Sequence, residues 1–93
     1  MSGTTDAGKS VAAANREKLK NLLLDVLLLE PSEFTFELKR EDVESWDSFG
    51  VVAIGVGLEE TFGYHPTQDE AMNLRSVPDI INLLQSKGIP FDE

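Results

Sequence analysis

The residue of this chain that is best placed for covalent chemistry is Ser48, which lies between a polar segment and an apolar stretch. The spacing of the apolar residues that follow predicts a helix beginning at Ser48. A serine at a helix start has its hydroxyl beside unpaired backbone N–H groups and the positive end of the helix dipole. A phosphate ester is favoured there because its charge is partly neutralised. An ordinary N-cap serine occupies the same position, so Ser48 alone does not separate these two roles.

The surrounding segment, residues 47–63, separates them. Asp47-Ser48-Phe49 is followed, at a spacing that looks gapless, by Leu58-Glu59-Glu60-Thr61-Phe62. In motif and spacing the segment resembles the acyl carrier protein family, in which an Asp-Ser-Leu motif opens a helix that ends in Leu-Glu-Glu-x-Phe. The resemblance covers roughly residues 15–87.

The expected fold class is all-α, a four-helix bundle of the acyl-carrier type. It has a long loop between helices 1 and 2 and a short helix 3. We expect helices from about Asn15 to Leu29, from Ser48 to about Phe62, after the Thr67-Gln68-Asp69-Glu70 capping box, and from about Ser76. Residues 30–47 are interpreted as an extended loop, because their alternating apolar residues have no partner strand. The apolar residues expected to anchor this loop are Phe34, Phe36, Leu38, Val43 and Trp46.

We divide the chain into a flexible N-terminus (1–14), a carrier domain (15–88) and a C-terminal tail (89–93). The first of these is rich in Ser, Thr, Gly and Ala and has no apolar periodicity, which is typical of a frayed terminus.

Composition excludes several classes of function. The chain of 93 residues has no cysteine, so it cannot form disulfides or thiolate metal sites, and its carboxylates lack EF-hand spacing; we expect no metal site. A net charge of −9 disfavours nucleic acid and anionic membranes. No apolar run has transmembrane length, so we expect no membrane insertion and a cytoplasmic location.

Residues 30–47 contain seven acidic and two basic residues, a local charge that favours basic partners beside Ser48.

The helix after Ser48 has two apolar stripes. Val51, Ile54, Leu58 and Phe62 are assigned to the core, and Phe49, Val52 and Val56 to partner contact, together with the acidic Glu59 and Glu60. Many members of the family that the chain resembles have acids one turn after the serine, where this chain has Gly50 and Ala53. Gly55 lies beside the core stripe, and close helix packing is our preferred explanation for it over a slot for an attached chain.

The resemblance implies a function. A phosphopantetheinyl transferase would move 4′-phosphopantetheine from coenzyme A onto Ser48, with Asp47 in a supporting role. The arm's thiol would hold an acyl group as a thioester for fatty-acid, lipid or polyketide-type biosynthesis. Acyl-activating and acyl-transferring enzymes would be the partners of a monomer that has no catalytic residues and is not an enzyme. Two alternatives stay open: an aminoacyl or peptidyl carrier protein, and an unmodified helical interaction module in which Ser48 is only a cap.

Overall fold

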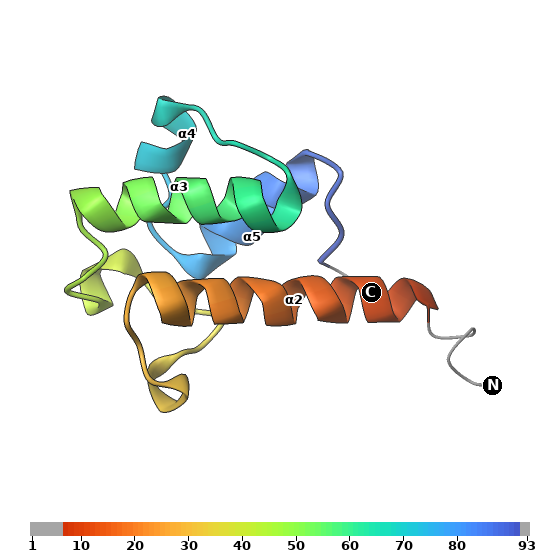
Figure 1. Ribbon diagram of the computed structural model, residues 1–93, viewed down its shortest axis with the longest axis horizontal. Helices are drawn as coiled ribbons and strands as arrows, with labels where there is room; N and C mark the ends of the chain where they lie inside the picture. The colour runs from red at the N-terminus through yellow and green to blue at the C-terminus, as the bar shows by residue number, and fades with distance from the viewer. Residues whose placement is uncertain (1–6, 92–93) are drawn as a thin grey trace.

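The computed structural model describes residues 7–91, and within them the chain forms four α-helices and two short 3-10 helices (Figure 1). The α-helices are α2 (Ala7–Val26), α3 (Ser48–Phe62), α4 (Gln68–Met72) and α5 (Val77–Ser86); the 3-10 helices are η1 (Pro31–Glu33) and η2 (Arg40–Asp42). The predicted all-α bundle, with a long first connection and a short third helix, is confirmed.

The core is formed where α2, α3 and α5 meet. In Figure 1, α2 and α3 run in opposite directions, and the long loop joins them at one end of the molecule. Each helix contributes one apolar face: Leu19, Leu22, Leu23 and Leu27 from α2, Val51, Ile54 and Leu58 from α3, and Val77, Ile80 and Leu84 from α5. Full burial of each such side chain stabilises the fold by about 1.5–3 kcal/mol, so this cluster fixes how the helices are arranged.

The first helix begins and ends earlier than predicted. A start near Asn15 is wrong, because α2 begins at Ala7. Ala12 is fully buried, and Asn15 Nδ2 donates a hydrogen bond to the Pro90 carbonyl oxygen at 2.9 Å. The preceding residues lack apolar periodicity but contain several alanines, which have the highest helix propensity. The helix then ends at Val26 rather than Leu29.

A left-handed residue ends α2. Leu28 has φ +56°, and the Leu29 N–H donates to the Leu24 carbonyl at 2.9 Å, as in a Schellman motif. Glycine is the usual residue at this position. No glycine stands at this position, which explains why the predicted helix continued to the residues before Pro31.

The chain that follows α5 also packs on the core. Gly88, shortly after that helix, has φ +87°. Phe91 is 1% exposed, and its ring centroid lies 5.6 Å from that of Phe62. The division at 14/15 and 88/89 stays a prediction, but residues on both outer sides of it contribute buried side chains.

The long loop is pinned to the start of α5. The Arg40 N–H donates to the Arg75 carbonyl at 2.7 Å, and the Val77 N–H donates to the Leu38 carbonyl at 2.9 Å. Four of the five predicted anchors are buried or half-buried: Phe34, Leu38, Val43 and Trp46. The fifth, Phe36, is 37% exposed and lies edge-on to the Phe34 ring. The loop is not extended throughout, because η1 and η2 interrupt it.

Helix α4 is fixed beside the N-terminal half of α3 (Figure 1). The predicted capping box is confirmed: Thr67 Oγ1 accepts from the Glu70 N–H at 3.1 Å, and Glu70 Oε1 accepts from the Thr67 N–H at 3.0 Å. The Tyr64 hydroxyl also donates to Glu70 Oε1, which lowers the pKa of Glu70 and raises that of Tyr64. Lys87 Nζ, 3.4 Å from Glu70 Oε2, links this short helix to the end of α5.

Candidate functional site

The turn into α3 is held by side-chain hydrogen bonds from the loop. Ser45 Oγ donates to the Leu27 carbonyl at 2.7 Å, and Arg40 Nε donates to the Trp46 carbonyl at 2.9 Å. Trp46 is 2% exposed and packs in the core, as predicted. The residues immediately before α3 are therefore fixed against the end of α2.

Asp47, and not Ser48, is the N-cap of α3. Asp47 Oδ1 accepts from the Gly50 N–H at 3.0 Å, and the Asp47 carbonyl accepts from the Val51 N–H at 2.9 Å. Ser48 is the first helical residue and is exposed. Its hydroxyl makes no hydrogen bond to any residue between 7 and 91. Capping therefore does not explain this serine, and its oxygen is free to react.

The two predicted apolar stripes of α3 differ in burial, as expected. The core stripe is buried or half-buried: Val51 4%, Ile54 1%, Leu58 0% exposed, with Phe62 half-buried. The second stripe is exposed: Phe49 85%, Val52 66% and Val56 45%. Its exposure is confirmed, and its role in partner contact stays a prediction.

The two acids predicted to help partner binding are exposed near the other end of α3. Glu59 Oε1 lies 3.0 Å from His65 Nδ1. At 1.5 Å per residue, Glu59 is about 16 Å along the helix from Ser48. Four acidic residues of the preceding loop are closer to the serine along the chain than this pair is: Glu41, Asp42, Glu44 and Asp47.

A pocket of about 470 Å³ opens beside Ser48, between α3 and α4. Its lining is mostly apolar or small: Ser48, Val51, Val52, Gly55 and Val56 from α3, His65, Pro66 and Thr67 from the connection, and Gln68, Ala71 and Met72 from α4. Sequence reasoning missed Met72, which is 49% exposed. The sequence signal that could have identified Met72 was an apolar side chain just after the capping box, on a helix too short to bury it.

The glycines of α3 have different roles. A Cβ on Gly50 would lie 2.5 Å from the Ser45 carbonyl oxygen, and one on Gly57 would lie 3.0 Å from the Leu22 side chain. Close packing therefore explains both. It is wrong for Gly55, where a Cβ would meet no atom within 4 Å, so this glycine leaves space in the pocket wall. The absence of an acid at position 50 likewise follows from the contact with Ser45.

The described residues contain no group of three or more histidine, cysteine, aspartate or glutamate side chains able to hold a metal ion. Within the same residues, no helix is long and apolar enough to cross a membrane. That the chain binds no metal stays a prediction.

Comparison with known proteins gives several relatives of one kind. The chain is 30% identical over 70 residues to the acyl carrier protein of Clostridium acetobutylicum, covering 75% of this chain and 91% of the relative. It is 30% identical over 71 residues to that of Thermosynechococcus vestitus, covering 76% and 88%. For that of Coprothermobacter proteolyticus the identity is 26% over 70 residues, covering 75% and 85%. No family model matches the chain.

Gly50→Ala and Gly55→Ala form a matched pair on one helix. We expect Gly50→Ala to lower the free energy of unfolding by about 1–3 kcal/mol, because the new methyl group meets a backbone oxygen. Gly55→Ala should raise it by about 0.5–1 kcal/mol through helix propensity. Urea unfolding followed by circular dichroism measures both, and equal effects would contradict the different roles assigned to the two glycines.

Proposed function

Since this chain belongs to the acyl carrier protein family, we propose that it carries an acyl group as a thioester on a 4′-phosphopantetheine arm attached to Ser48. The observation that carries the proposal is the exposed Ser48 hydroxyl, left free at the first turn of α3 because Asp47 caps the helix. The pathway would be fatty-acid, lipid or polyketide-type biosynthesis, and the chain itself would catalyse no reaction.

The first turn of α3 suits a phosphate ester. In the attachment step, Ser48 Oγ would lose its proton and form a bond to the phosphorus of coenzyme A that bears the pantetheine, while adenosine 3′,5′-bisphosphate leaves. The backbone N–H groups of the first helical turn and the helix dipole would stabilise the phosphate charge. The prosthetic group would supply the thiol, which the chain cannot provide because it has no cysteine.

The pocket between α3 and α4 favours the proposal of an acyl cargo over the alternative of an unmodified helical interaction module. Its lining includes Ser48 and the side chains of Val52 and Val56, and Gly55 leaves space in its wall. Burying apolar area in such a pocket is favourable, at about 25 cal/mol per Å². An acyl chain on the arm would find apolar contacts there.

We propose that Phe49, Val52 and Val56 form a docking surface for the phosphopantetheinyl transferase and for acyl-activating and acyl-transferring enzymes. All three side chains are exposed within about two turns of Ser48. Exposed apolar patches beside a reactive group commonly mark protein contacts. The acidic residues of the loop before α3 would attract a basic partner toward this surface.

Removing one hydroxyl tests the attachment site. Ser48→Ala should keep the helical circular dichroism spectrum but gain no phosphopantetheine mass when incubated with coenzyme A and a broad-specificity transferase. Ser45→Ala is the matched control and should still be loaded, although it loses the hydrogen bond to Leu27. Intact-mass spectrometry measures both, and a loaded Ser48→Ala protein would overturn the assignment.

A polar substitution tests the docking surface. Val52→Ser should reduce the rate of loading by about fivefold or more, since contact residues that matter contribute above 1 kcal/mol. Its stability should change by less than about 1 kcal/mol, because the side chain is 66% exposed. Val11→Ser, on α2 and 48% exposed, is the control and should load at the unchanged rate. Equal rates for the two variants would exclude Val52 from the docking surface.

A further inference from the structure

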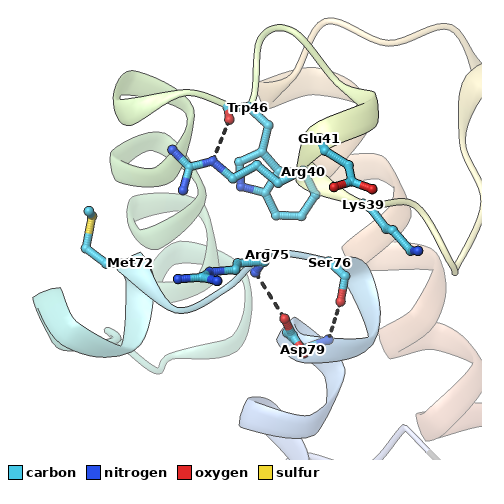
Figure 2. A pocket seen from close by; sticks show the side chains of 8 residues that line it. All are labelled: Lys39, Arg40, Glu41, Trp46, Met72, Arg75, Ser76 and Asp79. Carbon is cyan, nitrogen blue, oxygen red and sulfur yellow. Dashed lines mark hydrogen bonds between the residues drawn. The ribbon is translucent and has the colours of Figure 1, made fainter.

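A second pocket, of about 700 Å³, lies between the long loop and the start of α5 (Figure 2). We call it the arginine pocket, because Arg40 comes from the loop and Arg75 from the residues before α5. With Lys39 it holds three of the chain's eight basic residues, against two acidic residues, Glu41 and Asp79. In a protein of net charge −9, this is a local excess of positive charge.

Within the part of the chain that the structure describes, the two guanidinium groups of the arginine pocket have no carboxylate partner. Among residues 7–91, neither Arg40 nor Arg75 makes an ion pair. Arg40 uses only Nε, for the Trp46 carbonyl, so its two terminal nitrogens remain available. The nearby Asp79 accepts from the backbone N–H of Arg75 at 3.1 Å. Figure 2 shows both guanidinium groups toward the Met72 side of the pocket, with Lys39 and Glu41 on the other side.

The lining also adds apolar contact, and one of its residues, Trp46, has a buried donor without a partner among the described residues. Trp46 is 2% exposed, and its Nε1–H is buried without an acceptor among the described residues. Leaving such a donor unpaired costs about 1–3 kcal/mol. Met72 adds a flexible thioether side chain that is 49% exposed. The pocket thus combines cationic groups with apolar surface, and the group it lacks is a hydrogen-bond acceptor with negative charge.

We propose that the arginine pocket binds the free carboxylate of an acyl cargo derived from a dicarboxylic acid, with Arg40 and Arg75 as its partners. Planar guanidinium groups are well matched to carboxylate oxygens, and such charge-assisted bonds are stronger than neutral ones. The inference rests on the proposed function, because the cargo would reach the pocket on the arm attached to Ser48.

The arrangement of the two pockets makes this route short. Met72 lines both the pocket that begins at Ser48 and the arginine pocket. Arg40 donates a hydrogen bond to Trp46, which is two residues before Ser48. The Cα atoms of Trp46 and Ser48 are therefore at most about 7 Å apart. No residue of α3 lines the arginine pocket. The phosphate at the base of the arm would therefore remain at α3, and a group near the far end of the arm would enter the arginine pocket.

The experiment compares two cargoes of the same chain length. The apo protein is loaded by a broad-specificity transferase with coenzyme A, butyryl-coenzyme A or succinyl-coenzyme A, and intact mass verifies each product. Trp46 is the only tryptophan, so its indole N–H gives a single resonance in a ¹H–¹⁵N spectrum. We expect the succinyl form to shift the Trp46 indole and Arg40 Nε–H resonances relative to the holo form, and the butyryl form to leave them unchanged.

Variants identify the partner of the carboxylate. Arg75→Gln should abolish the shift that is specific to the succinyl form, while Lys18→Gln, on α2 outside the arginine pocket, should preserve it. The Arg75 side chain makes no hydrogen bond or ion pair with the described residues, so this variant should fold and load normally.

Each other result overturns the proposal in a recognisable way. Identical spectra for the loaded succinyl and butyryl forms would show that the pocket does not take a carboxylate. A shift already present in the holo form and lost in Arg75→Gln would assign the site to the arm's phosphate instead. A shift produced equally by free succinate added to the apo protein would show binding of a solution anion only. Failure to load at all would appear in the mass and would overturn the proposed function as well.

Discussion

The hydrogen bond from the Gly50 N–H to the Asp47 carboxylate determines what Ser48 can do. Aspartate and serine are both good N-caps, and whichever residue caps the helix has its side chain occupied by the backbone. Here the aspartate takes that role, and the serine becomes the first helical residue with an uncommitted hydroxyl. The cap depends in turn on the loop, which the Ser45–Leu27 and Arg40–Trp46 hydrogen bonds fix in place. The reactive position is thus a consequence of how residues 40–50 pack against α2.

The same packing explains why α3 has a glycine at position 50. A side chain at position 50 would collide with the Ser45 carbonyl oxygen, so an acid there is incompatible with this turn. At Gly55 the neighbouring space is empty and belongs to the pocket between α3 and α4. That pocket is bounded by α4, which the contacts among Tyr64, Glu70 and Lys87 tether to the end of α5. One helix therefore combines a rigid attachment turn, an apolar pocket and an exposed apolar stripe.

Local signals in the sequence predicted the capping box at Thr67 and the start of the last helix near Ser76, because these depend on side chains that bond the backbone three residues away. The bounds of α3 were predicted from its apolar spacing, although Asp47 and not Ser48 is its N-cap. The start of α2 was not predictable from periodicity, since its first turns are rich in alanine and largely lack an apolar stripe. The roles of Gly50 and Gly55 depend on atoms that lie across a loop or against another helix. The meeting of Arg40 with Arg75 likewise requires the tertiary fold, because 34 intervening residues separate them in sequence.

We propose that the Ser48 hydroxyl is where the phosphopantetheine arm is attached. The most direct measurement is tandem mass spectrometry of proteolytic peptides from the wild-type protein, purified from cells that also produce a broad-specificity phosphopantetheinyl transferase. We expect the phosphopantetheine mass, and the fragment ions that its loss produces, to localise to Ser48. Modification at Ser45 or another hydroxyl, or a protein fully lacking the added mass, would contradict it.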